Sequence, residues 1–214
     1  MTSPDGLVVV DYEAGNLGSI PNMLRRLGAE ATLSSDPDVV ANAGRLILPG
    51  VGAFDHGMTK LESLGLAGAL RQAVEERGVP IIGMCLGMQL MTQRSDEGQK
   101  PGLGWIEAET VHFAAGLPQG ASALRLPHIG WNYAYQVQEH PLTTGLPDPS
   151  SFYFVHTFRV VCRYVEDLLL GSRYAGLNFC SAFVRNNVCA VQFHPEKSHR
   201  YGVELLRRFV EWKP

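Results

Sequence analysis

Short runs of aliphatic and β-branched residues alternate with segments of helical periodicity through the first half of the chain. Strands are predicted at Leu7 to Val10, Ala31 to Leu33, Arg45 to Leu48 and Val79 to Met84. Helices are predicted from Asn16, as N-cap, to about Leu27, from Asp36-Pro37, and from Leu66 to Arg77, with Gly28 and Gly78 as stops. This alternation favours right-handed crossovers and a mostly parallel sheet covered on both faces. Ligands of such sheets bind beyond the carboxyl ends of the strands.

The pattern changes after about Pro101, where strand-like runs are separated by Gly, Pro and Asn turns. These runs are Thr110 to Phe113, Trp131 to Gln136, Phe152 to Thr157, Leu168 to Tyr174, Phe179 to Val184 and Val188 to Phe193. We expect them to extend the same sheet with antiparallel strands. His199 to Trp212 predicts a final amphipathic helix whose Val203, Leu206 and Val210 face the core. The sequence shows no repeat and no linker, so one α/β domain over residues 1–214 is expected.

Composition narrows the possible partners. The 214 residues are 45% apolar and 18% charged with a net charge of −3, which favours neither disorder nor binding to a polyanion. Nucleic acid is therefore not an expected partner. The first six residues contain no basic stretch followed by an apolar run, and no uncharged apolar segment approaches ~20 residues. We expect a soluble cytoplasmic protein that does not bind membranes.

The four cysteines show no CxxC spacing, and a chain of this length needs no disulfide framework. Reduced thiols are expected. Cys162, Cys180 and Cys189 lie among strand-like residues and are interpreted as small buried hydrophobic residues. Cys85 has different neighbours and is considered separately.

Cys85 lies where a buried strand runs directly into a predicted helix, within Gly83-x-Cys85-x-Gly87. A nucleophile at a sharp strand-to-helix turn needs small residues two before and two after it, because its backbone is strained and its neighbours approach closely. The helix that follows directs its N-terminal amides at the sulfur, which favours the thiolate. The competing interpretation is a tight turn with an inert buried cysteine. The strand, both glycines and the helix together favour a catalytic nucleophile.

A thiol nucleophile needs a proton-transfer partner, and His194 is the best placed of the seven histidines. It directly follows a predicted strand and precedes Pro195, so it lies at the edge where such sheets build sites. Glu196 can accept from the second imidazole nitrogen and hold its tautomer. By itself a His-Pro-Glu tripeptide is typical of a surface turn. The other histidines, His56, His112, His128, His140, His156 and His199, show no metal-ligand spacing and are interpreted as mostly structural or surface residues, so no metal is expected.

A third element follows the predicted strand that ends at Leu48, where Pro49 to Gly52 is rich in glycine. Acyl transfer requires backbone N–H groups that face the developing oxyanion, and glycines let the backbone approach closely. The amides of Gly50 to Gly52 and of Leu86 could form that oxyanion hole. A phosphate-binding loop is less favoured because the Gly-Lys-Ser/Thr ending is absent, and a plain loop remains an alternative.

These three segments, in this order, resemble the class I, or triad, glutamine amidotransferase family over essentially the whole chain. The resemblance implies that Cys85, His194 and Glu196 form a catalytic triad which hydrolyses glutamine through a thioester, without a cofactor. It implies an oxyanion hole and substrate site made by Gly50, Val51, Gly52, Leu86, Gln89, Thr157 and Phe158. The fold implied is a mostly parallel central sheet flanked by helices, with an antiparallel extension in the second half.

Within this family the chain is most similar to the glutaminase subunits of imidazole glycerol phosphate synthases, which act in histidine biosynthesis. The matching segments are Asp11-Tyr12 with Gly15 to Leu17, Pro49 to Phe54, Pro127 to Asn132, Tyr153 to Thr157 and Gln192 to Ser198. Glu13-Ala14 and Phe158 depart from the usual pattern. The resemblance implies a heterodimer with a (β/α)8-barrel cyclase that receives the ammonia. It also implies an interface that contains Asn16, Trp131, Tyr153 and Lys197, although Trp131 and Tyr153 could be core aromatics and Lys197 a solvated charge.

Other functions remain open at this point. The nearest is a glutaminase for anthranilate, guanylate or pyridoxal phosphate synthesis, against which the segment Gly130-Trp131-Asn132 argues. A more distant alternative is a cysteine hydrolase or peptidase that acts without a partner. A catalytically inactive binding module is disfavoured because every triad position is filled.

Overall fold

The computed structural model describes residues 6–15, 18–116 and 125–214. Its helical segments are α1 (Ser19–Arg26), α2 (Pro37–Ala41), α3 (Phe54–Ser63), α4 (Leu66–Arg71), η1 (Gln72–Glu76), α5 (Leu86–Leu90), η2 (Val165–Asp167), η3 (Pro195–Lys197) and α6 (His199–Glu211). Its strands are β1 (Leu7–Val10), β2 (Thr32–Ser34), β3 (Arg45–Leu48), β4 (Ile81–Met84), β5 (Arg94–Ser95), β6 (Ala108–His112), β7 (His128–Gln136), β8 (Ser150–His156), β9 (Phe158–Cys162), β10 (Leu168–Tyr174), β11 (Leu177–Arg185) and β12 (Val188–Val191). No helix in the described ranges is long and apolar enough to cross a membrane.

The strands form one mixed sheet, in the order β2-β1-β3-β4-β12-β11-β10-β7-β8, with β9, β6 and β5 attached beside β11. The first five strands of that order are parallel to one another. From β12 to β8 each neighbouring pair is antiparallel. The predicted fold class, a parallel central sheet with an antiparallel extension in the second half, is therefore confirmed. β12 joins the two parts because it pairs with β4 in parallel and with β11 in antiparallel fashion.

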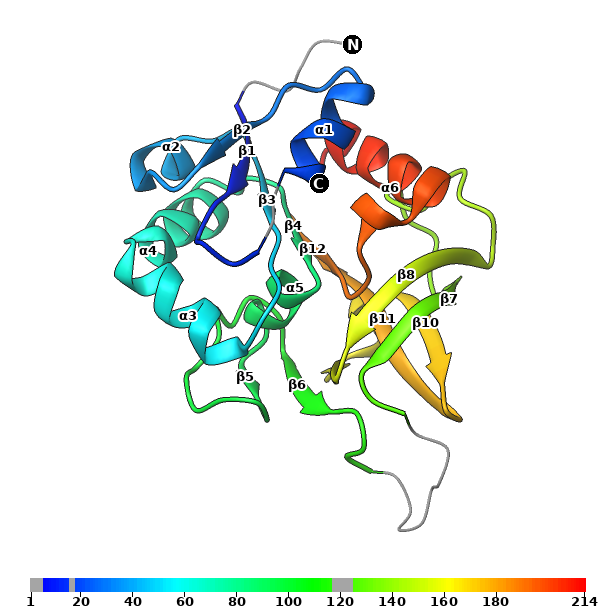
Figure 1. The fold of residues 1–214 in the computed structure, drawn as a ribbon. Coiled ribbons are helices and arrows are strands. Elements are labelled where there is room, and N and C mark those ends of the chain that lie inside the picture. The colour runs from blue at the N-terminus through cyan, green and yellow to red at the C-terminus, as the bar shows by residue number, and fades with distance from the viewer. Residues whose placement is uncertain (1–5, 16–17, 117–124) are drawn as a thin grey trace.

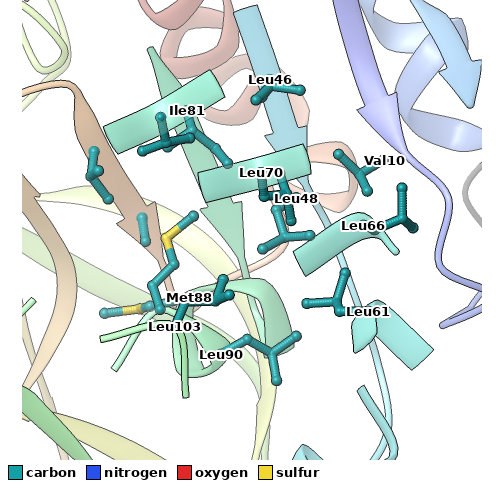
Figure 2. Close-up of a cluster of buried hydrophobic side chains, with 14 of the residues drawn as sticks. Val10, Leu46, Leu48, Leu61, Leu66, Leu70, Ile81, Met88, Leu90 and Leu103 are labelled. Atoms are coloured by element: carbon teal, nitrogen blue, oxygen red, sulfur yellow. The ribbon is translucent and has the colours of Figure 1, made fainter. Parts of the chain in front are cut away.

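Helices cover both faces of the parallel strands, as Figure 1 shows, with α2, α3 and α4 on one side and α1 and α6 on the other. The strands alternate their side chains between two buried clusters. Val8, Leu46 and Ile81 belong to the cluster beneath α2 to α5, part of which is drawn in Figure 2. Their neighbours Leu7 and Ile47 face the cluster beneath α1 and α6. Burial on both faces explains why these strands appear in the sequence as continuous apolar runs.

Most predicted elements are found within one or two residues of their expected ends, and the structure adds α3, β5 and β9. The helix predicted from Leu66 to Arg77 begins as α4 and continues through η1 as a π-helix. The first helix begins at Ser19 after Gly18, later than predicted, and Asn16 lies outside the described residues. Gly28 ends that helix as expected, with a φ of 74° and its N–H bonded to the Arg25 carbonyl.

The predicted core face of the last helix is correct at Leu206 and lies to one side of the actual centre at Val203 and Val210. In α6 the buried residues are Gly202, Leu205, Leu206 and Phe209. Val203 and Val210 are only partly buried, at the margins of that face. The apolar stripe is thus centred on Leu205, Leu206 and Phe209. The predicted positions Val203, Leu206 and Val210 lie on a stripe rotated to one side of the face that is actually buried.

Arg45, the first residue of β3, fixes the end of α6 against the sheet. Its two terminal guanidinium nitrogens donate to the carbonyl oxygens of Phe209, at 2.8 Å, and Trp212, at 2.7 Å. These carbonyls lie at the end of the helix, where the last acceptors lack partners within the helix, although the Phe209 carbonyl also accepts from the Trp212 N–H at 3.2 Å. The side chain is buried, and burial lowers the pKa of Arg45 from its ordinary value.

Replacing Arg45 should destabilise the fold. In Arg45→Met the two carbonyls lose charged donors while most of the side-chain volume is retained, so the free energy of unfolding should fall by about 2–3 kcal/mol. Denaturation in urea measures this change. The control is Arg200→Met, because Arg200 is exposed on the same helix and its effect should stay within about 0.5 kcal/mol. Equal effects of the two substitutions would contradict the capping role of Arg45.

Candidate active site

The predicted site residues follow three neighbouring strands of the parallel part of the sheet. The Pro49 to Gly52 segment follows β3, Cys85 follows β4, and His194 comes three residues after β12. These strands are adjacent, with Leu48 paired with Gly83 and Met84 paired with Val191. Their carboxyl ends therefore bring the three segments to one edge of the sheet, as the sequence predicted.

Cys85 occupies the sharp turn between β4 and α5. Its backbone has φ 53° and ψ −108°, in the half of conformational space that residues with side chains rarely adopt. Its N–H donates to the Val191 carbonyl at 2.8 Å, which ties the turn to β12. The residue is 7% exposed. The structure thus holds a buried thiol on a strained turn.

The two glycines around Cys85 are required by close packing. A Cβ atom on Gly87 would lie 1.8 Å from the carbonyl oxygen of Leu48 in β3, and one on Gly83 would lie 2.8 Å from the Gly87 carbonyl oxygen. Real Cβ atoms do not approach that closely. The Gly-x-Cys-x-Gly spacing is therefore explained by two contacts, of Gly87 with the neighbouring strand and of Gly83 with the helix that follows the turn.

His194 lies between Cys85 and Glu196. Its Nδ1 is 2.8 Å from Glu196 Oε1, and the imidazole also interacts with the Cys85 side chain, whose sulfur lies 3.7 Å from the Val155 carbonyl oxygen. Burial alone would lower the pKa of His194, but the hydrogen bonds and charges of Cys85 and Glu196 outweigh burial and raise the pKa to about 9. The imidazole is therefore held in a position where it can exchange a proton with the thiol.

The main chain fixes His194 from two sides. Its N–H donates to the Tyr153 carbonyl of β8 at 2.9 Å, and its own carbonyl accepts from Ser198 Oγ at 2.6 Å. Ser198 Oγ also accepts from the Tyr153 N–H at 3.0 Å. The imidazole is thus positioned by β8 and η3 together.

Two of the amides expected to face an oxyanion, those of Leu86 and Val51, are engaged with backbone carbonyls. The Leu86 N–H donates to the Gly50 carbonyl at 3.2 Å, and the Val51 N–H donates to the Ala14 carbonyl at 3.4 Å. In this conformation the Leu86 N–H, which an oxyanion would need as a donor, is already hydrogen-bonded to the Gly50 carbonyl oxygen. An oxyanion bound at the Leu86 N–H would have to displace the Gly50 carbonyl oxygen.

A cavity of about 290 Å³ opens beside the thiol. This volume is at the small end of the ~300–1,000 Å³ typical of ligand pockets, which suits a molecule the size of an amino acid. It is lined by most of the predicted substrate residues together with residues from β8 and its surroundings, namely Val51, Gly52, Cys85, Leu86, Gln89, Glu97, Pro127, Val155, His156, Thr157, Phe158, His194 and Lys197. Gly50 lies in a smaller cavity that also touches His194 and Glu196.

Two buried histidines support one wall of this cavity. His156 Nδ1 bonds to the Phe158 carbonyl at 2.7 Å, and His156 Nε2 bonds to His128 Nδ1 at 2.9 Å. His128 Nε2 is in turn 3.2 Å from Asn132 Nδ2. Burial lowers the pKa of His128 to about 4 and that of His156 to about 3. The sequence interpretation of these histidines as structural fits this chain of contacts, but His156 also lines the cavity.

The predicted interface residues that the structure describes lie on β7, β8 and η3. Trp131 in β7 is 49% exposed and is therefore not a core aromatic. Its ring stacks on His199 at 5.2 Å and meets the ring of Tyr153 in β8 edge-on at 6.0 Å. Lys197 is exposed and lines the cavity. Asn16, the fourth residue of this group, lies outside the described part of the chain.

Sequence reasoning missed Gln192 as a separate participant. It is fully buried directly after β12, and its side chain contacts both Gln89 and Cys85. A polar residue at the end of a buried strand, two positions before His194, was the available signal. Among the other cysteines, Cys180 and Cys189 are buried as predicted, whereas Cys162 is half-buried.

The sheet, the strained cysteine turn and the adjacent histidine and glutamate define a glutamine amidotransferase of the triad class. The chain belongs to this family, because the family model "Glutamine amidotransferase class-I" matches residues 8–212. It is 42% identical over 205 residues to the imidazole glycerol phosphate synthase subunit HisH 2 of Methanococcus maripaludis, covering 96% of this chain and 98% of that protein. The protein of the same name from Pseudomonas aeruginosa is 44% identical, with the same coverage.

Solved structures share the fold at lower sequence identity. A crystal structure of a glutamine amidotransferase superposes with a TM-score of 0.72 at 23% identity, covering 96% of this chain and 98% of that one. The structure of PurLQS from Thermotoga maritima gives a TM-score of 0.70 at 16% identity, covering 97% and 98%. These similarities concern the architecture.

The raised pKa of His194 leads to a test of the Glu196 contact. Because the folded-state pKa is raised to about 9, the imidazole should stay protonated up to about that pH and lose its proton above it. In Glu196→Gln the carboxylate charge is lost, so the midpoint should fall by about one pH unit or more. Histidine ring resonances recorded by NMR against pH measure both midpoints.

His128 and His156 are internal controls in the same spectra. Both should remain neutral above about pH 5, since burial lowers their pKa values to about 4 and about 3. A midpoint for His194 that is the same in the wild type and in Glu196→Gln would contradict the assigned contact.

Proposed function

We propose that this chain is the glutaminase subunit of an imidazole glycerol phosphate synthase. It hydrolyses L-glutamine to glutamate and ammonia and passes the ammonia to a (β/α)8-barrel cyclase subunit. The observation that carries the proposal is the arrangement of Cys85, His194 and Glu196 beside a cavity at the ends of adjacent parallel strands. About 40% identity over nearly the full length to subunits named HisH supports the choice of synthase.

The chemistry follows from the positions of the three side chains. The Cys85 sulfur attacks the side-chain carbonyl carbon of glutamine while His194 holds the thiol proton. His194 then gives that proton to the departing nitrogen, and ammonia leaves a thioester on Cys85. Water, activated by His194, hydrolyses the thioester to glutamate and restores the thiol. Glu196 keeps the imidazole oriented and balances its positive charge.

The occupied oxyanion donors suggest where the partner acts. Turnover requires the Gly50 carbonyl to leave the Leu86 N–H, because the oxyanion must take its place. The Gly50–Val51 peptide lies beside the cavity, and Val51 is 45% exposed. A partner that covers this edge can therefore favour the competent peptide orientation and at the same time enclose the ammonia.

The partner-facing surface is proposed to include Trp131, Tyr153 and Lys197. Trp131 presents an exposed ring that stacks on His199, and Lys197 has no salt-bridge partner in the described ranges. Lys197 is also the residue after Glu196, in η3. A charge pair between Lys197 and an acidic group on the cyclase would join docking directly to the segment that carries the triad.

Cys85→Ala should abolish glutamine hydrolysis, because no other thiol borders the cavity. We expect a loss of about 10⁴-fold or more, as for removal of other catalytic nucleophiles. The assay measures glutamate formed from L-glutamine in the presence of the cyclase. Cys189→Ala is the matched control, since Cys189 is equally buried but lies within β12, and it should retain turnover. Turnover retained by Cys85→Ala would rule out the thioester mechanism.

Lys197→Ala should preserve the isolated fold but weaken docking or activation by the cyclase. Loss of a charge pair at the rim of the interface should reduce the affinity or the stimulation by about tenfold, which corresponds to ~1.4 kcal/mol. A titration with cyclase, followed by glutamine turnover, gives both quantities.

Lys213→Ala provides the matched control for Lys197. Lys213 is exposed beyond α6, whose end is bound to the first residue of β3 at the opposite edge of the sheet. The interface would be wrongly placed at Lys197 if both lysine variants bound the cyclase and responded to it like the wild type. A wild-type chain that the cyclase neither binds nor stimulates would instead favour another partner.

A further inference from the structure

Gln192 is a fully buried side-chain amide whose two ends are both engaged at the site. Its Oε1 accepts from Gln89 Nε2 at 3.2 Å, and its Nε2 lies 3.9 Å from the sulfur of Cys85. Neither the fold nor the triad requires a polar side chain at this position, and a buried amide is costly unless its polar atoms are paired. Its contacts are with the nucleophile and with a residue of the glutamine cavity.

We propose that Gln192 is a further residue of the catalytic site, in which its N–H group stabilises the reacting sulfur and its carbonyl oxygen holds the side chain of Gln89 in place. This inference rests on the proposed glutaminase function for its second part. Its first part concerns the nucleophile alone.

The backbone places Gln192 beside Cys85 independently of either side chain. Val191 pairs with Met84, so the residues that follow these two strands emerge next to each other. The Cys85 N–H bonds to the Val191 carbonyl, and the Gln192 N–H bonds to the Ser181 carbonyl of β11, each at 2.8 Å. Gln192 is thus anchored on both sides, and its side chain has little freedom to turn away from the sulfur.

The contact with Gln89 fixes the direction of the Gln192 amide. Because Oε1 accepts the hydrogen bond from Gln89, the NH₂ group of Gln192 must face the sulfur. A donor directed at sulfur favours the thiolate over the thiol. The contact is long, so a modest effect on the thiol equilibrium is expected.

The same contact orients Gln89 toward the cavity. Gln89 follows Cys85 by one turn of α5 and is 5% exposed, with its side chain among the residues that line the cavity. With Nε2 donating to Gln192, its Oε1 remains available to accept a hydrogen bond from a bound amino acid. Gln192 therefore acts on substrate binding through Gln89.

Other charged or titratable groups also face the thiol. His194 forms a hydrogen bond with it, and Tyr12 and Cys85 influence each other electrostatically from the buried side. Glu196 on η3 helps to raise the pKa of His194, His194 in turn helps to lower the pKa of His156 on β8, and Lys197 lines the cavity. Substitutions at Gln192 and Gln89 leave all of these groups in place, so a changed thiol titration reports the loss of the amide.

The test compares Gln192→Met with Gln89→Met. Both replace an amide by an apolar side chain of similar length, but only the first removes the donor at the sulfur. Alkylation of Cys85 by iodoacetamide is followed by mass spectrometry of its peptide from pH 5 to 10, and KM for glutamine is measured in parallel. In Gln192→Met the alkylation midpoint should rise by about 0.5–1 pH unit, which slows alkylation about three- to tenfold below the midpoint. KM should rise in both variants.

Gln89→Met should shift the alkylation midpoint less than Gln192→Met, because Gln192 keeps its N–H group next to the sulfur although Gln89 no longer fixes the direction of its amide. An unchanged midpoint in Gln192→Met, or an equal shift in both variants, would overturn the role at the nucleophile. An unchanged KM in Gln192→Met would overturn the role toward Gln89. If Gln192→Met does not fold, Gln192→Asn provides the same readouts, because its amide is one methylene too short to reach the sulfur.

The alkylation experiment needs neither glutamine nor a partner, so the two proposals fail separately. A shifted midpoint in a chain whose wild type does not hydrolyse glutamine would retain Gln192 at the thiol and refute the glutaminase function. If the wild type hydrolyses glutamine but Gln192→Met shows no shift of the alkylation midpoint, the glutaminase function stands and the role of Gln192 at the thiol is refuted.

Discussion

The turn at Cys85 is built against the backbone of β3 with no space between them, and the site depends on this contact. Gly87 rests on the Leu48 carbonyl, so the first turn of α5 lies directly over the end of the neighbouring strand. That contact brings the Leu86 amide within reach of Gly50 and leaves Cys85 with a positive φ. The positions of the nucleophile and of the amide next to it are therefore set by strand spacing rather than by their own side chains.

The opposite side of the site is carried by β12 and its continuation. Gln192 and His194 are two residues apart and approach Cys85 from the same strand. β12 lies at the boundary between the parallel and antiparallel parts of the sheet, and its position is set by pairing on both sides. A displacement of β12 would consequently change the proton-transfer partner and the buried amide together.

The sequence predicted the parallel strands and the meeting of Cys85, His194 and Glu196 because both depend on local signals. The strands are continuous apolar runs, and the Gly-x-Cys-x-Gly spacing reflects two close contacts, of Gly87 with the Leu48 carbonyl and of Gly83 with the Gly87 carbonyl. The sequence did not predict α3, whose N-cap, Ala53, has no capping side chain. Its first amide is satisfied instead by Glu97 Oε2 at 2.9 Å, from a residue 43 positions away. A cap supplied across such a separation leaves no pattern near the helix.

Long-range contacts also explain the other features of the structure that the sequence did not predict. β9 was not predicted because it directly follows β8 after Thr157, with no turn residue between the two strands. The role of Gln192 depends on side chains that follow different strands and is visible only after those strands are paired. The engaged state of the Leu86 and Val51 amides is a property of backbone orientation, about which residue identity says little.

The hydrogen bonds of His128 and His156, behind the cavity wall, fix which ring nitrogen of each histidine carries its proton. The Phe158 carbonyl can only accept, so His156 must carry its proton on Nδ1 and accept from His128 through Nε2. His128 must then accept from Asn132, and every hydrogen in the chain of contacts points the same way. Neither ring can take a second proton without breaking a bond to its neighbour. The wall behind Thr157 and Phe158 therefore stays uncharged and in a single tautomer across the pH range near 9 in which His194 loses its proton.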